Sequence, residues 1–182
     1  MSPPFRVVSA EPLLASRVFD VERRLISDGD QTFSRDVVVH RGAVAVLAFS
    51  DAGQIGVIRQ YRSTFDTEVR EIPAGTLDVA GEDPLDAARR ELREELGREA
   101  ATWTLLGRFM VSPGWCDQVM TIFEARGLTE VPRDPAGPEE SASTVEWHTP
   151  DGLLATLRAD RLVDFTTTVA LHRVYGRFFD VV

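Results

Sequence analysis

Three glutamates, Glu91, Glu94 and Glu95, lie within about one turn of a segment whose residue pattern predicts a helix. At about 100° per residue, their carboxylates project from the same face of that helix. Like charges at this spacing repel each other, so something should offset the repulsion. Hard cations such as Mg²⁺ and Mn²⁺ prefer carboxylate oxygens, and they would also neutralise the phosphates of a substrate. The alternative is a solvated face whose glutamates pair with arginines of the same helix.

The helix that carries these glutamates is predicted from its two ends. Asp83 suits the N-cap, and Pro84 fits the first helical position because its missing N–H is not needed there. Gly97 fits the left-handed residue that follows the last turn, so the helix should run from Pro84 to Leu96. Apolar residues at spacings of three and four should pack this helix on a sheet; they are Leu85, Ala88, Leu92 and Leu96.

Runs of β-branched and aromatic residues, bounded by Asp and Gly, predict strands on both sides of this helix. The strands are expected at Arg17–Ser27, Phe33–His40, Ala43–Ser50, Ile55–Tyr61, Trp103–Val111, Val119–Ala125 and Thr144–His148. The third and fourth of these should form a hairpin, because only Asp51–Gln54 joins them.

The rest of the chain is predicted to be one loop and two helices. Prolines and a glycine interrupt Val131–Ser143, which should therefore be a loop. Helical spacing of apolar residues predicts helices at Asp151–Leu157 and Asp164–Phe179, with Asp164 capping the second. Strands, a central helix, more strands and terminal helices together imply an α+β layered domain rather than a doubly wound parallel sheet.

Composition narrows the classes of function. A chain of 182 residues with 43% hydrophobic and 27% charged residues is typical of one soluble globular domain. The net charge of −9 argues against nucleic acid as a partner, since such binding needs many Lys and Arg contacts. No signal peptide or membrane segment is recognised, and the single cysteine, Cys116, agrees with a reducing compartment. We therefore expect a cytoplasmic protein.

The segment from Glu82 to Gly97 resembles the Nudix box, which defines a superfamily of hydrolases. Glu82 is followed by seven residues and then by Arg-Glu-Leu-Arg-Glu-Glu-Leu-Gly, as in the box. Two positions depart from it: six residues rather than five separate Gly75 from Glu82, and Arg98 stands where an aliphatic residue is usual. The resemblance implies a Nudix-type α/β/α sandwich with a mixed sheet and a central Nudix helix.

The same resemblance assigns roles to individual residues. The metal ligands would be Glu91, Glu94, Glu95 and the main-chain carbonyl of Ala74. Roughly two or three ions are implied, Mg²⁺ first and Mn²⁺ second, and they would lower the pKa of a water nucleophile. Arg90 would hold the glutamates in place and take part in catalysis with Glu94. Glu82 would tie the preceding loop to the helix, while Gly75 and Gly97 would serve the motif structurally.

Residues outside the box resemble the ADP-ribose pyrophosphatase branch of the superfamily. These are Arg59-Gln60-Tyr61-Arg62, Glu71-Ile72-Pro73-Ala74-Gly75 and Pro113, which lies sixteen residues beyond Gly97. Arg62 could bind phosphate oxygens as a fork, and Gln60 and Pro113 would also contact substrate. Arg35 and Arg70 are further candidates, with plain surface arginines as the alternative. Taken alone, Pro113 and the glycine after it would be a turn between strands.

A general base is expected in the loop after the box, within reach of the attacking water. By resemblance it is a glutamate of the stretch Pro138-Glu139-Glu140-Ser141, and we favour Glu140 over Glu139. The alternative is that both glutamates of this Pro- and Gly-rich loop are merely solvated.

The leading hypothesis is hydrolysis of ADP-ribose or a related nucleoside diphosphate sugar to AMP and a sugar phosphate, which is ribose 5-phosphate for ADP-ribose. A second possibility is a Nudix hydrolase of a dinucleoside polyphosphate or an oxidised nucleotide, and a third is a sensing module that binds without cleaving. The resemblance also implies a homodimer. Strands in residues 1–36 would contribute to its interface, and residues 37–182 would form the Nudix domain.

Overall fold

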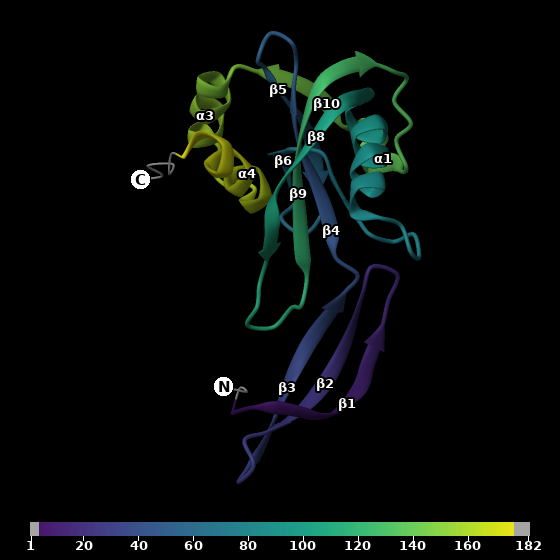
Figure 1. Cartoon of the computed structure of the whole chain (residues 1–182), viewed down its shortest axis with the longest axis vertical. Helices are drawn as coiled ribbons and strands as arrows, with labels where there is room; N and C mark the ends of the chain where they lie inside the picture. Colours follow the sequence, from purple (N-terminus) through teal and green to yellow (C-terminus); the bar gives the residue numbers. More distant parts are fainter. Residues whose placement is uncertain (1–3, 177–182) are drawn as a thin grey trace.

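The computed structural model describes residues 4–176, in which the strands form two separate sheets (Figure 1). The three-stranded sheet near the N-terminus consists of β1 (Arg6–Ala15), β2 (Phe19–Ser27) and β3 (Thr32–His40). The seven-stranded sheet consists of β4 (Ala43–Phe49), β5 (Ile55–Arg62), β6 (Thr67–Glu71), β7 (Ala74–Thr76), β8 (Arg98–Met110), β9 (Val119–Glu130) and β10 (Thr144–His148).

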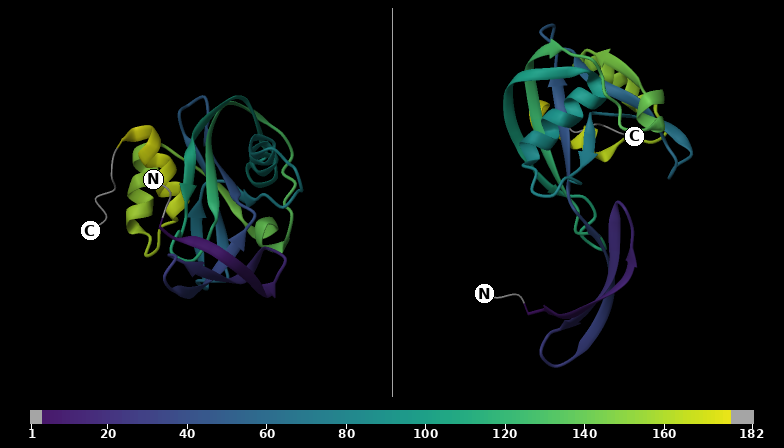
Figure 2. Two further views of the ribbon diagram at one scale, coloured as in Figure 1. Left: turned by 60° about the horizontal axis from the view of Figure 1, so that its bottom comes forward. Right: turned by 90° about the vertical axis from the view of Figure 1, so that its right-hand side faces the viewer.

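Helices cover the seven-stranded sheet on both faces. They are α1 (Pro84–Leu96), the short α2 (Pro138–Ala142), α3 (Pro150–Ala159) and α4 (Phe165–Tyr175). Helix α1 lies on one face of the sheet, and α3 and α4 lie on the other (Figures 1 and 2). The three-stranded sheet extends away from this body, and no helix of the described residues lies over it (Figure 2). Within residues 4–176, no helix is both long enough and apolar enough to cross a bilayer.

The main path of the seven-stranded sheet has the order β10-β5-β4-β9-β8, with β6 beside β5 and β7 beside β4. Strands β4 and β9 run parallel, whereas β8–β9, β5–β10, β5–β6 and β4–β7 are antiparallel. The predicted α+β sandwich with a mixed sheet is therefore confirmed.

Strand β4 lies in the middle of this sheet, and every residue from Ala43 to Phe49 is buried. A continuous apolar run is expected where both faces of a strand are covered. On one face Val46 packs in the same cluster as Leu92 of α1. On the other face Leu47 belongs to the cluster that contains Leu171 of α4. The two clusters hold the three layers together.

The hairpin between β4 and β5 is present as predicted, but the two strands soon separate. Their paired register covers Ala48 beside Gly56 and Phe49 beside Ile55. Further along, β5 pairs with β6, while β7 pairs with the other end of β4, where Ala74 lies opposite Ala45. Strand β7 therefore fills a fork in the sheet, directly beneath α1, which it contacts.

Several predicted strand boundaries are wrong. The strand expected from Arg17 begins only at Phe19, because Arg17 lies in the turn after β1, and β1 itself was not predicted. Strands β6 and β7 were also missed; they are too short to show a period of two. Strand β8 begins at Arg98 rather than Trp103, because its pairing with β9 extends to Arg98 opposite Glu130 and overrides weak local preference.

The second half of the chain departs less from prediction. The segment expected to be a loop, residues 131–143, contains the five-residue helix α2. Helix α3 is slightly longer than predicted, running from Pro150 to Ala159. Helix α4 has the predicted cap, since the Asp164 side chain accepts the Thr167 N–H, and it ends at Tyr175 before a left-handed Gly176. The remainder of the predicted helix, residues 177–179, lies outside the described residues.

Candidate functional site

Helix α1 has both predicted caps, and they fix its position over the fork. The Asp83 carboxylate accepts the Leu85 N–H at 2.8 Å, and Pro84 occupies the first turn. Gly97 adopts φ 62° and ψ 46°, a left-handed conformation that glycine reaches without the strain of a Cβ atom.

The three glutamates of α1 are arranged around Arg90. Glu91 and Glu95 are buried, with 5% and 2% of their surface exposed, and Glu94 is partly buried. Arg90 Nη1 donates to Glu91 Oε1 at 2.6 Å and to Glu94 Oε2 at 3.0 Å. Its Nε and Nη2 donate to Glu82. The Arg90 side chain thus joins Glu82, in the loop before the helix, to Glu91 and Glu94. The resemblance implies these contacts for Arg90 and Glu82.

The backbone of β7 lies directly against these carboxylates. The Ala74 N–H donates to Glu95 Oε2 at 2.9 Å. A Cβ atom placed on Gly75 would lie 2.0 Å from Glu91 Oε1, far inside van der Waals contact. Position 75 is therefore glycine because a glutamate carboxylate occupies the space that any side chain would need. The extra residue between Gly75 and Glu82 leaves this contact intact.

Burial makes these carboxylates hard to ionise in the absence of a cation. Loss of solvent raises the pKa of Glu91 to about 7, and the charges of Glu94 and Glu140 add to the effect although Arg90 opposes it. Loss of solvent also raises the pKa of Glu95 strongly and that of Glu94 less. Buried carboxylates are stabilised as anions by paired charge or metal.

The donor set fits a divalent cation. Oxygen ligands from carboxylates and a carbonyl are what Mg²⁺ and Mn²⁺ accept, and buried acidic groups with raised pKa values gain most from a neighbouring positive charge. Across residues 4–176, however, no three acidic, histidine or cysteine side chains are already gathered at ligand spacing. The carboxylates of Glu91 and Glu94 are turned to Arg90, and that of Glu95 is turned to Ala74.

Ala74, Arg90, Glu91 and Glu94 line one wall of a cleft of about 430 Å³, whereas the buried Glu95 is not part of this lining. Helix α2 forms the opposite wall and brings both predicted loop glutamates into the lining. The two differ in their surroundings. The charge of Glu140 raises the pKa of Glu91, Glu94 and Glu95, whereas that of Glu139 acts on Tyr61. Glu140 Oε2 also accepts the Ala136 N–H at 2.7 Å, which fixes its side chain.

A larger, mainly apolar hollow of about 770 Å³ adjoins this cleft. Val18, Arg62, Ala74 and Glu139 line both. The hollow is otherwise walled by the turn after β5, the ends of β8 and β9, and the start of α4. Its apolar lining includes Phe65, Val69, Val111, Met120, Leu162, Val163 and Phe165. An acidic cleft joined to an apolar hollow suits a molecule with a charged middle and a less polar end.

Gln60 and Arg62 lie at this site, as the sequence predicted. Arg62 holds the Glu71 carboxylate with Nε at 2.8 Å and with Nη2, and this fork raises the pKa of Arg62. Gln60 is buried, and among the described residues its Oε1 has no hydrogen-bond partner.

Three other predicted substrate contacts are not brought to the cleft of this chain. Arg70 donates to Glu146 Oε2 at 2.9 Å and to both Asp160 carboxylate oxygens. Arg35 lies on β3, over the Phe33 ring. Pro113 lies in the connection between β8 and β9 and is not part of the lining of either hollow.

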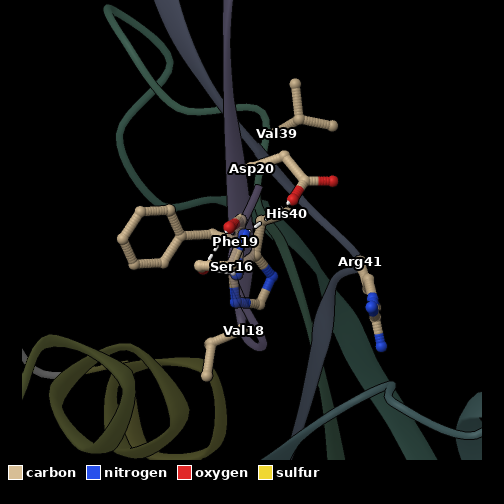
Figure 3. A pocket seen from close by; sticks show the side chains of 7 residues that line it. All are labelled: Ser16, Val18, Phe19, Asp20, Val39, His40 and Arg41. Atoms are coloured by element: carbon tan, nitrogen blue, oxygen red, sulfur yellow. Dashed lines mark hydrogen bonds between the residues drawn. The ribbon is translucent and has the colours of Figure 1, made fainter. Parts of the chain in front are cut away.

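Several residues in the lining were not predicted, and two of them come from the three-stranded sheet. Arg17 and Val18 reach the cleft from the turn between β1 and β2. No spacing in the sequence marks them, because their placement depends on how the three-stranded sheet joins the body. At this junction the residues of the turn, together with His40 and Arg41 at the end of β3, line a small pocket of about 100 Å³ (Figure 3).

Comparison with known proteins agrees with this geometry. The NUDIX domain model matches residues 39–168. An ADP-ribose pyrophosphatase of Mycobacterium tuberculosis (strain ATCC 25618 / H37Rv) is 41% identical over 145 residues, which is 79% of this chain and 70% of the relative. A methanol dehydrogenase activator of Bacillus methanolicus is 33% identical over 168 residues, 91% of this chain and 90% of the relative.

A solved structure supports the fold independently. The crystal structure of an ADP compounds hydrolase superposes with a TM-score of 0.79 at 23% identity, covering 94% of this chain and 92% of that one. The chain belongs to the Nudix family. The predicted resemblance to its ADP-ribose pyrophosphatase branch is confirmed by the 41% identical relative.

Proposed function

We propose that this chain is a divalent-metal-dependent Nudix pyrophosphatase that cleaves the diphosphate bond of ADP-ribose or a related nucleoside diphosphate sugar. The products are AMP and a sugar phosphate, ribose 5-phosphate in the case of ADP-ribose. The observation that carries the proposal is the cleft that Glu91 and Glu94 of α1 line and that adjoins an apolar hollow. The relative from Mycobacterium tuberculosis, named for ADP-ribose, supports the same substrate.

Glu91, Glu94, Glu95 and the Ala74 carbonyl would hold the cations, Mg²⁺ or Mn²⁺. When bound, these ions would lower the pKa of the attacking water and offset charge on the leaving phosphate. Arg90 keeps the carboxylates together through the contacts described above. Arg62, at the border of cleft and hollow, would donate to a phosphate oxygen with the part of its guanidinium that Glu71 leaves available.

Glu140 is the proposed general base. A base must lie within hydrogen-bond reach of the water that it deprotonates. The influence of Glu140 on the pKa of all three α1 glutamates supports this role, since it requires the Glu140 carboxylate to be near them. Glu139, which lines the hollow and whose charge acts on Tyr61, is better placed to face the substrate than the water.

A substrate panel tests the proposed function. Phosphate-containing products would be measured from ADP-ribose, ADP-glucose and a dinucleoside polyphosphate, each with and without Mg²⁺. We expect the largest kcat/KM with ADP-ribose or ADP-glucose, and no turnover without the metal. A preference for the dinucleoside polyphosphate or an oxidised nucleotide would replace this substrate assignment. Tight binding of ADP-ribose without any turnover would instead indicate a sensing module.

We also propose that the chain forms a homodimer through the strands near its N-terminus, with residues 37–182 as the Nudix domain. Large apolar side chains are exposed in and beside the three-stranded sheet: Phe5, Val7, Val8, Leu13, Leu14, Val18, Phe19 and Leu25. Several exposed large apolar side chains on one small sheet commonly indicate an interface. A second copy would cover it symmetrically, because the same patch would face itself across a two-fold axis.

The proposed location is the cytoplasm, and the proposed partner is the small-molecule substrate rather than nucleic acid or a membrane. The net charge of −9 opposes binding to a phosphate backbone. Cys116 is the only cysteine in the sequence and is a free, buried thiol, as is usual in a reducing compartment.

A further inference from the structure

The segment between β9 and β10, residues 131–143, joins the end of α1 to α2. Val131 N–H donates to the Gly97 carbonyl at 3.0 Å. A Cβ atom on Gly97 would lie 2.8 Å from the Val131 carbonyl oxygen and 2.9 Å from Arg133 Cγ. Glycine is therefore required at position 97 for two reasons: the backbone there is left-handed, and residues 131–133 lie directly against it.

Arg133 extends this contact to α2. Its Nη2 donates to Ser143 Oγ at 2.9 Å and to the Glu140 carbonyl at 3.3 Å, and its Nη1 reaches the Ser143 carbonyl at 3.4 Å. Ser143 Oγ in turn donates to the Glu140 carbonyl at 2.7 Å, and Ser143 N–H donates to the same oxygen at 3.1 Å. Three donors thus converge on the main chain of Glu140.

The burial of Ser143 and the restricted backbone around Arg133 indicate a well-ordered connection rather than an incidental surface contact. Ser143 is buried, and Arg133 is partly buried, with its Nε shielded from solvent and without an acceptor among the described residues. Pro132 and Pro135 flank Arg133 and restrict the backbone on either side of it. Helix α2 has only five residues, too few to be stable by itself.

We infer that Arg133 is a positioning residue, which holds the main chain of Glu140 so that its carboxylate faces the glutamates of α1. This inference rests on the proposed function, in which Glu140 is the general base. Through Gly97 and Arg133, the carboxyl end of the metal-binding helix sets the position of the base on the opposite wall of the cleft. Lysine cannot replace Arg133, since one ammonium group does not present the planar fork that reaches several acceptors at once.

The test is a double-mutant cycle with Arg133→Met and Glu140→Gln, using ADP-ribose and Mg²⁺. Arg133→Met should lower kcat by roughly 10- to 100-fold, since a shift of about 1 Å in a catalytic group can cost that much. The KM for ADP-ribose and the Mg²⁺ concentration for half-maximal activity should stay within about twofold, since the metal ligands and the apolar hollow are untouched. In the Glu140→Gln background, Arg133→Met should have no further effect on kcat.

Arg98→Met is the matched control, because Arg98 Nη1 donates to the Gly97 carbonyl at 2.8 Å at the same end of α1. This variant should keep wild-type kcat. Arg133→Lys should behave like Arg133→Met. Amide hydrogen exchange should show faster exchange at Ser141 and Ser143 in Arg133→Met, with α1 unchanged. If Arg133→Met does not fold, Ser143→Ala, which removes one acceptor and one donor of the network, should lower kcat severalfold with the same pattern of exchange.

The outcomes separate the inference from the function on which it rests. If Glu140→Gln loses activity while Arg133→Met and Ser143→Ala do not, Arg133 does not position the base. The same conclusion follows if the effects of Arg133→Met and Glu140→Gln multiply. If Glu140→Gln keeps wild-type kcat, the assignment of the base is wrong and the inference fails with it. If the wild-type protein cleaves neither ADP-ribose nor ADP-glucose in the panel described above, the proposed function itself is wrong.

Discussion

Strand β4 buries every residue from Ala43 to Phe49, whereas strand β1 exposes every residue from Arg6 to Ala15. The difference follows from what covers each sheet. Helices cover both faces of the seven-stranded sheet, but in the part of the chain that the structure describes no helix lies over the three-stranded sheet, which extends from the body (Figures 1 and 2). The two sheets are nevertheless joined, through Asp117, which accepts the His40 N–H at 2.8 Å and pairs with Arg24.

The two sheets differ in what stabilises them. The body has its own apolar core and should fold by itself around β4. A sheet of three strands depends on an apolar face for its stability, and within residues 4–176 no helix covers this sheet (Figure 2). We therefore expect changes in the body to act on catalysis, and changes in the three-stranded sheet to act on assembly.

The largest effect is expected from Glu95→Gln in the body. The amide oxygen can still accept the Ala74 N–H, so the fold should persist, but the charge needed to hold a cation is lost. Activity should fall by more than about 100-fold, beyond what the loss of an outer-sphere partner costs. Mg²⁺ should raise the Tm of the wild type and not that of this variant.

Glu99→Gln is the control for that variant, since Glu99 is exposed and lies near Arg93 rather than in the cleft. Its activity should match the wild type. Full activity of Glu95→Gln, with a normal Mg²⁺-dependent rise in Tm, would remove Glu95 from the set of metal ligands.

A somewhat smaller effect is expected from Gly75→Ala. The added Cβ would collide with the Glu91 carboxylate, which is buried and bound to Arg90, so this carboxylate must leave its position. Activity should fall by roughly 10- to 100-fold, as for other changes that misplace metal ligands. The Tm should change little, because the clash is with the end of a side chain and not with the backbone. Gly114→Ala, where a Cβ meets open space, should have no effect on kcat.

The three-stranded sheet is tested by Leu14→Glu. Leu14 is 52% exposed in this chain and should be buried against the partner in the proposed dimer. A buried charge there should weaken dimerisation by more than about tenfold, measured as molar mass against concentration. Leu105→Glu places the same charge on an equally exposed leucine of β8 and should leave the mass unchanged. Equal behaviour of the two variants would show that β1 is not the interface.

The smallest effect concerns the joint between the two sheets, where His40 Nδ1 accepts the Gly42 N–H at 3.0 Å. Loss of solvent lowers the pKa of His40 below 6.5, an effect that Arg41 strengthens and Asp117 opposes. The unfolded chain therefore binds this proton more readily, so the contribution of His40 to stability is present above pH 6.5 and is lost as pH falls through its lowered pKa.

Thermal unfolding between about pH 5 and about pH 8 would measure this contribution, with exchange of the Gly42 amide as the local probe. His40→Asn retains an acceptor for the Gly42 N–H but does not titrate in this range. The difference in Tm between wild type and variant should therefore change with pH. A constant difference would mean that protonation of His40 does not loosen the joint.

Prediction from sequence succeeded where the signals were local. Asp83, Pro84 and Gly97 define α1 by the conformations that each residue favours, and those preferences survive in the fold. The cap of α4 at Asp164 was predicted for the same reason. The short strand β7 gave no such signal. It exists because β4 and β5 separate, which is a property of the whole sheet.

In the site as well, placements that depend on local spacing were predicted, and placements that depend on distant residues were not. The spacing of the α1 glutamates placed them on one face of the helix, but it could not show that Glu91 and Glu94 bind Arg90 while Glu95 accepts the Ala74 N–H. Arg70 was a plausible phosphate ligand by its charge. Its ion pairs with Glu146 and Asp160 depend on residues more than seventy positions away, which no local pattern reports.

Strand β7, which fills the fork between β4 and β5, would contribute main chain rather than a side chain to the proposed metal site. The proposed contribution of Ala74 is a carbonyl oxygen, which every amino acid carries, so no replacement of its side chain deletes it. A mutation can displace this carbonyl only by moving strand β7, whereas a single substitution can remove each carboxylate. Of the proposed ligands, the main-chain carbonyl is therefore the one least sensitive to substitution at its own position.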